Sequence, residues 1–356
     1  FSKNLAPAII ARVKVLANLR LDEHRLPQDG RFKDEIGGRK FSFRVSIMPV
    51  FDGEKAELRI LEEEARIFSL SELGLTQDQQ EIVKQALKKP FGMILSTGPT
   101  GSGKTTTLYT LLQMLNTRAV NIATIEDPVE YRIPGVNQTQ IKPEIGLTFA
   151  NGLRSLVRQD PNILMVGEIR DNETAALAIH AALTGHLVLS TLHTNNAAGA
   201  IPRLIDMKAE SFLIASTASL IIAQRLVRRL CPEIKVPYKL SLSELAELGK
   251  SVNILGLNEV FRKRGILGPR QTLESVTFYR PGHSKECPDG YKGRIGIFEV
   301  LAITDKIRGL IFKGASGDEI ASQARSEGML TMQEAGFLAA AQGITSIEEV
   351  LRVTKE

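Results

Sequence analysis

The clearest chemical signal in this sequence is a phosphate-binding loop. Residues 98–105, Gly-Pro-Thr-Gly-Ser-Gly-Lys-Thr, match the pattern G-x4-G-K-[ST] in full. Glycines let the backbone curl so that N–H groups point at phosphate oxygens, and a following helix N-terminus adds partial positive charge. We expect Lys104 to reach the β- and γ-phosphates and the Thr105 hydroxyl to bind Mg²⁺. The predicted nucleotide ligands are Gly98, Thr100, Gly101, Ser102, Gly103, Lys104, Thr105 and Thr106.

A plain glycine-rich turn is the alternative to this interpretation. The context disfavours it, because the motif follows a predicted strand and opens a predicted helix. The motif therefore predicts that the chain binds a nucleoside triphosphate.

Acidic residues follow two other apolar segments that the sequence predicts as strands. Glu168 comes directly after residues 163–166 and Gly167, an arrangement typical of a carboxylate that activates or orients an attacking water. Glu126 and Asp127 end another apolar stretch. Because the carboxyl ends of parallel strands border the ligand crevice, they are placed to act as a second base or to hold Mg²⁺ through water. The alternatives are a surface glutamate and a solvated loop.

Two histidines flank the last predicted strand of this region. His193 follows the strand and His186 precedes it. A histidine at the crevice can hydrogen-bond a γ-phosphate and report the nucleotide state, although a lone histidine at a strand end is more often structural. The functional interpretation is favoured for His193, and both interpretations stay open for His186.

Three arginines lie outside the predicted nucleotide core, in the N-terminal part of the chain. Arg31, Arg39 and Arg44 could deliver a guanidinium across an interface and neutralise charge on the transferring phosphoryl group. Composition alone favours ordinary solvated arginines.

Alternating strands and helices position these residues. The pattern predicts strands over 93–96, 120–125, 163–166 and 187–191, and helices over 104–115 and 172–183. Thr76 and Gln79 form a capping-box pattern before a further helix. Strands that alternate with helices imply an α/β fold with a parallel, doubly wound sheet.

The remaining chain predicts additional parts around this core. We expect an N-terminal domain over 1–68, a linker over 69–76, the nucleotide-binding core over 77–230, an irregular insertion over 231–292 and a helical C-terminal subdomain over 293–356 that follows one strand.

Several local patterns give finer expectations. The pattern predicts a helix from Leu5 to Leu16, a turn over 28–31, and a hairpin of 41–47 with 56–61. The apolar run 212–223 predicts a buried helix that 225–229 finish. Ser316 with Glu319, and Ser346 with Glu349, are further capping-box pairs.

Composition narrows the function classes. The 356 residues carry a net charge of +5 and no Trp, and only 5% of them are aromatic. This disfavours a single-stranded nucleic-acid binder built on aromatic platforms. Cys231 and Cys287 lie far apart, so we expect free thiols in a reducing compartment. No run of 18 apolar residues is present, and the start inside an amphipathic helix predicts a fragment that lacks its N-terminus.

With these residues placed, the sequence resembles the secretion ATPase superfamily, specifically the type II secretion and type IV pilus assembly ATPases. The resemblance covers essentially the whole chain. It is carried by residues 25–31, 44–46, 124–131, 154–171, 185–194, 224–231 and 290–294.

The resemblance implies a RecA-like core with a small α+β, PAS-like N-terminal domain. It implies Mg²⁺-dependent ATP hydrolysis by a homo-hexamer, at the cytoplasmic face of the inner membrane, acting on a platform protein of a pilus or secretion machine. Nucleic acid is not expected as a partner. It also favours Arg31 and Arg44, ahead of Arg39, as charge-neutralising arginines.

The chain departs from the family in its cysteine motifs. Members usually carry two Cys-x-x-Cys pairs that bind zinc, whereas here one pair ends in Ile234 and the other begins with Ser284. His283 could replace one ligand but leaves the set incomplete, so we expect no zinc. The intervening leucines predict a helix instead. Because the retraction branch of the family lacks this subdomain, its degenerate form favours an assembly or secretion ATPase.

Two other functions remain as alternatives. A nucleic-acid-translocating P-loop ATPase lacks support from aromatic residues or a basic stripe. A nucleotide-binding scaffold without turnover is disfavoured by Glu168 and Lys104. A further N-terminal domain usual in the family is absent from this sequence, so we expect poor assembly or slow hydrolysis.

Overall fold

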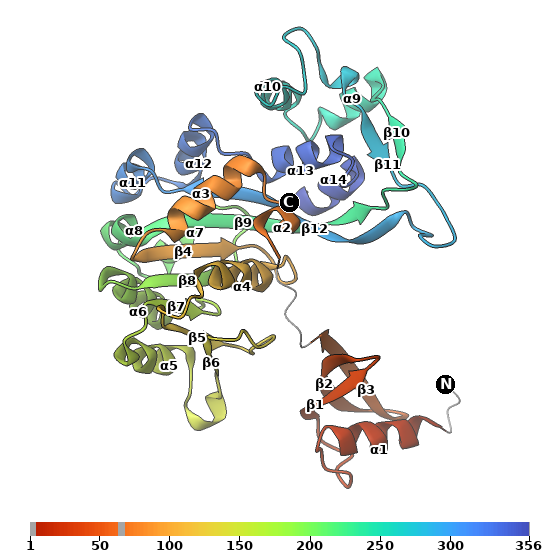
Figure 1. Cartoon of the computed structure of the whole chain (residues 1–356), viewed down its shortest axis with the longest axis vertical. Helices are drawn as coiled ribbons and strands as arrows, with labels where there is room; N and C mark the ends of the chain where they lie inside the picture. Colours follow the sequence, from red (N-terminus) through yellow and green to blue (C-terminus); the bar gives the residue numbers. More distant parts are fainter. Residues whose placement is uncertain (1–4, 63–67, 356) are drawn as a thin grey trace. The chain divides into compact units, whose positions relative to one another are not determined.

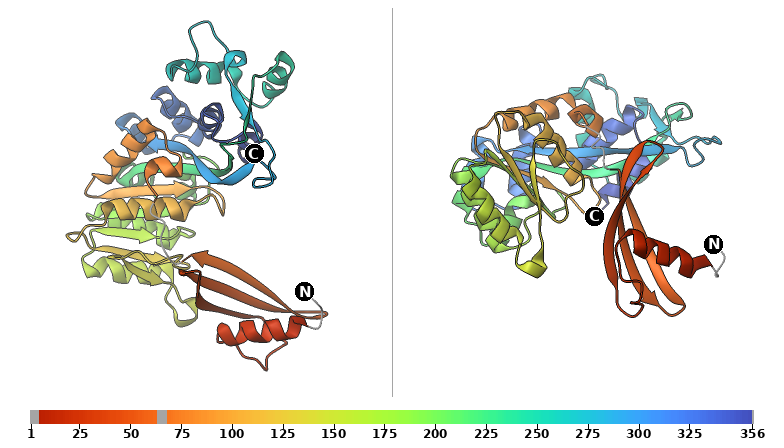
Figure 2. Two further views of the ribbon diagram at one scale, coloured as in Figure 1. Left: turned by 45° about the vertical axis from the view of Figure 1, so that its right-hand side comes forward. Right: turned by 60° about the horizontal axis from the view of Figure 1, so that its bottom comes forward.

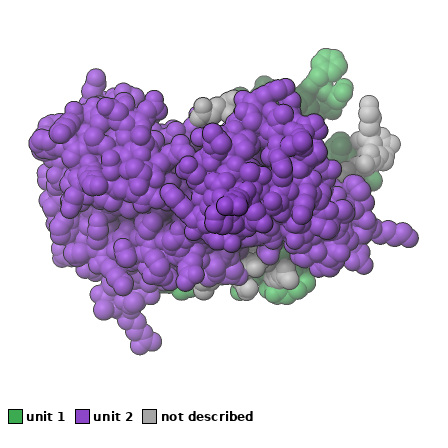
Figure 3. Space-filling view, turned by 90° about the horizontal axis from the view of Figure 1, so that it is seen from above, with its two compact units in different colours: residues 1–67, 128–138 green, residues 68–127, 139–356 purple. Residues whose placement is uncertain are grey.

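The computed structural model describes residues 5–62 and 68–355. The chain divides into two compact units. Unit 1 contains residues 1–67 and 128–138, and unit 2 contains residues 68–127 and 139–356 (Figure 3).

Unit 1 is a helix on a three-stranded antiparallel sheet (Figure 2). Its elements are α1 (Ala6–Leu16), β1 (Gln28–Ile36), β2 (Arg39–Val50) and β3 (Gly53–Glu62), and β2 lies in the middle of the sheet. Val13 of α1 packs with Val45 and Ile47 of β2 in a small apolar core. The predicted helix and hairpin are therefore confirmed.

The predicted turn over 28–31 is wrong, because these residues begin β1. Gln28 pairs with Ile47 and Arg31 with Arg44, so the partner strand overrides the local Asp-Gly turn signal. The glycine at position 30 is explained by close packing and not by a turn. A Cβ there would lie 2.8 Å from the carbonyl oxygen of Ala17, at the end of α1.

Unit 2 is built on a seven-stranded sheet of order β12-β9-β4-β8-β7-β5-β6 (Figure 1). Its strands are β4 (Gly92–Thr97), β5 (Ile122–Glu126), β6 (Asn137–Gln140), β7 (Ile163–Val166), β8 (Leu187–Leu192), β9 (Ala218–Leu230) and β12 (Tyr291–Ala302). Strands β5, β7, β8, β4 and β9 run parallel, and β12 is antiparallel to β9. The predicted α/β fold with a parallel sheet is confirmed.

Helices cover both faces of this sheet. They are α2 (Leu70–Leu73), α3 (Gln77–Leu87), α4 (Lys104–Leu115), α5 (Phe149–Leu156), α6 (Asn172–Leu183), α7 (Ala200–Asp206) and α8 (Ser211–Thr217), with 3₁₀ turns at Pro143–Ile145 and Val157–Gln159. Met93 and Leu95 of β4 share one apolar core with Ile179 of α6. Ile94 points to the opposite face and is equally buried, so neither face is left to solvent.

The predicted buried helix over 212–223 is wrong in its second half. Helix α8 ends at Thr217, and β9 begins at Ala218 and continues through the basic residues 225–229. The reason is tertiary, because β9 pairs with β4 on one side and β12 on the other. A short apolar run cannot be assigned to helix or strand from periodicity alone.

The insertion after β9 is more regular than predicted. It contains β10 (Val236–Tyr238), α9 (Leu242–Leu248), α10 (Ile254–Lys263), a 3₁₀ turn at Leu273–Ser275 and β11 (Phe278–Arg280). Helix α9 confirms the helix predicted from the leucines. Phe261 and Phe278 join Phe337 in a separate apolar core, so the insertion rests on the C-terminal helices.

The C-terminal part is helical, as predicted, after β12. Its helices are α11 (Asp305–Phe312), α12 (Gly317–Ser326), α13 (Met332–Ala341) and α14 (Ile347–Thr354). Ser316 and Glu319 form the predicted capping box. Ser346 caps α14, but the Glu349 carboxylate binds Arg228 and Arg352.

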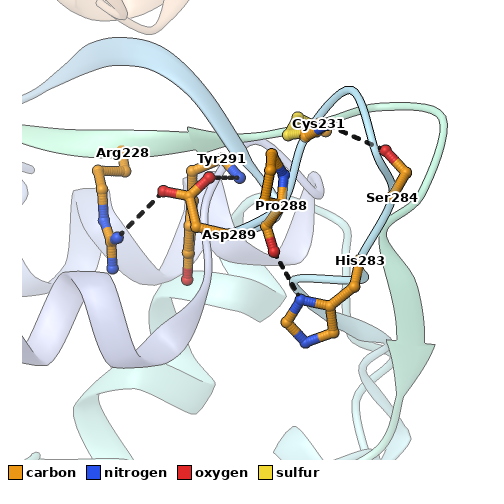
Figure 4. The surroundings of a disulfide bond; sticks show 8 residues. Arg228, Cys231, His283, Ser284, Pro288, Asp289 and Tyr291 are labelled. Atoms are coloured by element: carbon orange, nitrogen blue, oxygen red, sulfur yellow. Dashed lines mark hydrogen bonds and ion pairs between the residues drawn. A yellow bond between two sulfur atoms is a disulfide. The ribbon is translucent and has the colours of Figure 1, made fainter.

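The prediction that the cysteines are unpaired is wrong, because Cys231 and Cys287 form a disulfide (Figure 4). The sheet register explains why. Leu230 at the end of β9 pairs with Tyr291 at the start of β12, and the N–H of Cys231 donates to the carbonyl oxygen of Gly290. The N–H of Gly290 in turn donates to the carbonyl oxygen of Cys287, so a tight turn brings Cys287 to Cys231. His283, considered above as a zinc ligand, bonds the carbonyl oxygen of Pro288 at 2.8 Å.

The described residues offer neither a metal cluster nor a membrane-spanning helix. No group of three or more His, Cys, Asp or Glu residues there is arranged to hold a metal ion. Within residues 5–62 and 68–355, no helix has the length and apolar character needed to cross a membrane.

Candidate active site

The phosphate-binding loop connects the end of β4 to the start of α4. Gly98, Gly101 and Gly103 all have positive φ angles, of 147°, 78° and 90°. A Cβ on Gly98 would lie 2.6 Å from the carbonyl oxygen of Gln224, so this position requires glycine. Gly103 is the N-cap of α4 and offers no side chain to the first N–H groups of the helix. These donors are therefore available to an anion.

The side chains of the loop fit a phosphate ligand. Ser102 Oγ is buried and has no hydrogen-bond partner among the residues that the structure describes. Thr105 and Thr106, in the first turn of α4, are partly exposed, and Thr100 is exposed. An unpartnered buried hydroxyl beside free helix N–H groups is a set of donors without an acceptor, which a phosphate can supply.

Lys104 is folded against its own loop. Its Nζ donates to the carbonyl oxygens of Gly98 at 2.8 Å and Pro99 at 3.1 Å. Burial lowers the pKa of Lys104, while the charge of Glu168 opposes that shift and Arg225 adds to it. The lysine is 9% exposed and lies within electrostatic reach of the carboxylate predicted to orient water.

Glu168 and His193 meet at the ends of neighbouring strands. Glu168 follows β7 and His193 follows β8, and Glu168 Oε2 lies 3.6 Å from His193 Nε2. The same oxygen accepts from Arg170 Nε at 2.6 Å. Burial, followed by the charge of Lys104, lowers the pKa of His193, so the imidazole is neutral near pH 7. Three of the side chains predicted from the sequence, Lys104, Glu168 and His193, therefore interact in the structure.

The acidic pair after β5 occupies two different environments. Glu126 is buried, and its carboxylate accepts hydrogen bonds from Tyr109 and Thr124. Asp127 is exposed, and its charge acts on Arg170. Asp127 therefore faces solvent near the Glu168 cluster, whereas Glu126 is buried and hydrogen-bonded to its neighbours.

His186 is at the opposite end of the strands from this cluster. It precedes β8, and its Nδ1 lies 2.9 Å from the carbonyl oxygen of Ala181 in α6. Because β8 separates it from His193 along the chain, His186 lies at the amino end of the parallel strands. The structure therefore favours the structural interpretation that the sequence left open.

In unit 1, two predicted arginines are direct neighbours. Arg31 of β1 pairs in register with Arg44 of β2, and Arg44 pairs with Arg59 of β3, which places all three on one face of the sheet. Arg44 Nη2 lies 3.5 Å from Glu130 Oε2 within the same unit. Like charges in such a row repel one another, so the row is a favourable place for an anion. Arg39 begins β2, but its side chain lies outside the described part of the structure.

Gln224 is a site residue that the sequence analysis missed. It is buried in β9, donates from Nε2 to the carbonyl oxygen of Ser102 at 2.8 Å, and accepts from Ser96 Oγ at 3.1 Å. It thereby connects the phosphate-binding loop to the neighbouring strand. A polar residue that interrupts an apolar strand is the signal that could have found it, but the stretch was assigned to a helix.

The chain is similar to known proteins over almost its whole length. The family described as "Type II/IV secretion system protein" matches residues 2–352. The chain is 48% identical to the type II secretion system protein E of Xanthomonas campestris and 46% identical to the type IV pilus assembly ATPase PilB of Pseudomonas aeruginosa. Each alignment covers 99% of this chain and 59% of the relative. The chain thus spans about three fifths of the length of these relatives.

A solved structure gives the same fold. The pilus retraction motor PilT, determined with bound ADP, matches with a TM-score of 0.65 and 27% sequence identity. The match covers 93% of this chain and 78% of that one.

Proposed function

Because the chain belongs to the type II/IV secretion system protein family, we propose that it is an Mg²⁺-dependent ATPase that powers type IV pilus assembly or type II protein secretion. The observation that carries the proposal is the convergence of Lys104, Glu168 and His193 at the carboxyl ends of three parallel strands. This is the edge at which α/β sheets bind ligands.

Each residue has a role in this proposal. The backbone N–H groups of the loop, with Ser102 and Lys104, bind the phosphates of ATP, and Glu168 orients the attacking water. Mg²⁺ would be held by Thr105 and, through water, by Asp127, and it would neutralise charge on the β- and γ-phosphates.

The other predicted residues support the same reaction. We propose that Glu126, which is buried, supports the reaction by fixing the end of β5 through its hydrogen bonds to Tyr109 and Thr124. Arg31 and Arg44 are proposed to neutralise charge that develops on the transferring phosphoryl group. Their adjacency in the unit 1 sheet supports a joint action.

The proposed assembly is a homo-hexamer that is peripheral at the cytoplasmic face of the inner membrane and acts on a platform protein. The relatives' names support a place in a secretion or pilus machine. A nucleic-acid-translocating motor is the second candidate, and no observation on the described residues favours it.

The test compares Glu168→Gln with Lys104→Ala in the full 356-residue chain. We expect Glu168→Gln to bind a fluorescent ATP analogue as the original chain does but to lose about 10²–10⁴-fold in turnover, because a positioned base contributes about that much. Lys104→Ala should lose binding as well. Unchanged turnover in Glu168→Gln would remove this residue from its assigned role.

Two further measurements separate the candidates. Sedimentation with and without the ATP analogue tests for a hexamer. Adding double-stranded DNA at low and high salt tests the alternative, because turnover that rises with DNA at low salt would favour a nucleic-acid motor.

A further inference from the structure

A buried carboxylate lies outside the catalytic set. Glu299, in β12, is 5% exposed, and its Oε1 accepts the backbone N–H of Ala197 at 2.9 Å. The backbone N–H of Met332 faces the same carboxylate and favours its charged form. Glu299 therefore joins two segments that are far apart in the sequence.

The first of these segments is the loop that carries His193. This loop, residues 193–199, connects β8 to α7. The N–H of Thr194 donates to Thr97 Oγ1 of β4 at 2.9 Å, and Arg225 Nη2 of β9 donates to the carbonyl oxygen of Asn195 at 3.1 Å. With Glu299 of β12, three strands hold this loop, each through one polar side chain.

The second segment is the start of α13. Met332 is the first residue of that helix, and the first N–H groups of a helix have no partner within it. The Glu299 carboxylate faces one of them, the N–H of Met332, and attracts it. The same side chain therefore fixes both the His193 loop and the beginning of a C-terminal helix.

Two other hydrogen bonds near Ala197 are internal to the loop. Asn196 Oδ1 accepts from the N–H of Gly199, and Thr194 Oγ1 donates to the carbonyl oxygen of Asn196, but both partners belong to the loop itself. Thr194 and Asn195 are held by β4 and β9, and beyond them the bond from Ala197 to Glu299 attaches the part of the loop next to α7 to the sheet. Loss of this bond removes that attachment.

We propose that Glu299 is a positioning residue for ATP hydrolysis, which holds the His193 loop beside Glu168 and ties it to α13. This inference rests on the proposed ATPase function. A displacement of α13 would then shift the His193 loop, because the Glu299 carboxylate contacts both segments. Glu299 touches no predicted ligand of the nucleotide, so its effect is on the placement of His193.

The test replaces Glu299 and uses a neighbouring carboxylate as the control. Glu299→Ala removes the acceptor, whereas Glu299→Gln keeps an oxygen that can accept one N–H group. The matched control is Glu334→Gln, which removes the same charge at the start of α13 but contacts Thr331 and Arg325 and not the loop. Glutamine preserves a capping box, so the control should fold normally.

The expected result is a selective loss of turnover. Glu299→Ala should lower kcat by about 10- to 100-fold with KM for ATP within about twofold, because a misplacement of about 1 Å can cost that much. Glu299→Gln should fall between this variant and the original chain. Glu334→Gln should keep the original kcat.

A second readout does not depend on activity. Histidine NMR, with His193 assigned from a His193→Gln sample, gives the pKa of that side chain directly. Burial lowers this pKa in the structure. In Glu299→Ala it should rise towards 6.5 as the loop opens to water, while Glu334→Gln leaves it in place. Deuterium exchange of a peptide covering 192–200 should accelerate in the same variant.

The outcomes are distinguishable. If the original chain does not hydrolyse ATP, the proposed function fails, and the His193 pKa and the exchange rate still report whether Glu299 holds the loop. If the original chain is active and a folded Glu299→Ala or Glu299→Gln matches it in kcat and in the His193 pKa, the inference is overturned. If the alanine variant does not fold, the kcat and the His193 pKa of Glu299→Gln are compared with those of the original chain instead.

Discussion

At the scale of single residues, the site depends on how one imidazole is kept neutral. His193 is exposed to the positive charge of Lys104 and Arg170 and to the negative charge of Glu168. Burial is the largest influence, and together these effects lower its pKa. Protonation would add a further positive charge near Lys104, whose own pKa burial already lowers.

The pH dependence of turnover should reflect this histidine. The ordinary pKa of His193 is 6.5 and the folded value is lower, so the neutral form persists below pH 6.5. We expect kcat to be maintained as the pH falls to that lowered pKa and to decline below it, as His193 becomes protonated. The measurement is a kcat profile between pH 5 and 8.

The matched control for this profile is His186→Gln, which should keep the acid limb because His186 bonds α6 away from the cluster. His193→Gln should lack the limb contributed by the imidazole. An identical limb in the original chain and in His193→Gln would show that another group controls it.

At the scale of elements, β9 holds two loops of the site, a role that its sequence pattern did not predict. It supplies Gln224 to the phosphate-binding loop and Arg225 to the His193 loop from successive positions. Successive side chains of a strand point to opposite faces, so one strand can reach both loops. The two halves of the site are therefore held by the same strand.

Gln224→Ala tests the contact with the phosphate-binding loop. The carbonyl oxygen of Ser102 loses its donor, and we expect KM for ATP to rise by about tenfold, since a lost buried hydrogen bond costs about 1–2 kcal/mol. The control is Gln79→Ala, which removes another buried glutamine. Its Nε2 donates to the carbonyl oxygen of Phe298, away from the loop, and its KM should not change. Equal KM values for both variants would contradict the assigned contact.

The elements also show what sequence reasoning can predict. Helices α4 and α6 and strand β7 were predicted with their observed bounds, because a motif or a clear period marks each of them. The turn over 28–31 and the end of the helix near 223 were wrong, because pairing with distant strands decided them.

The candidate site divides in the same way. Lys104, Glu168 and His193 follow from motifs and from strand ends, whereas Gln224 and Glu299 act through bonds to residues more than 90 positions away. No local pattern encodes those partners. Only the register of β9 and β12 within the sheet reveals them.

At the scale of the whole molecule, the disulfide closes the insertion at its base. Cys231 and Cys287 are 56 positions apart, and β10, α9, α10 and β11 lie between them. A cross-link over a long loop stabilises mainly by restricting the unfolded chain. We expect Cys231→Ser with Cys287→Ser to lower the free energy of unfolding by about 2–4 kcal/mol.

The measurement is urea denaturation of the double variant, with the original chain under reducing conditions as a comparison. Both should lose similar stability if the bond is the cause. Thiol titration of the unreduced, denatured chain should find none reactive, and two after reduction. Two reactive thiols before reduction would contradict the pairing.

The same disulfide determines whether proteolysis within the insertion releases separate fragments. Arg270 is exposed between α10 and β11, inside the segment that the bond encloses. Trypsin cleavage there would interrupt the peptide backbone but would not separate the two fragments, since the sulfur bridge still connects them. A nicked molecule should therefore migrate as one species on a denaturing, non-reducing gel and as two when the bridge is reduced. The bridge thus keeps β12 covalently attached to the part of the chain that carries the other six strands of the sheet.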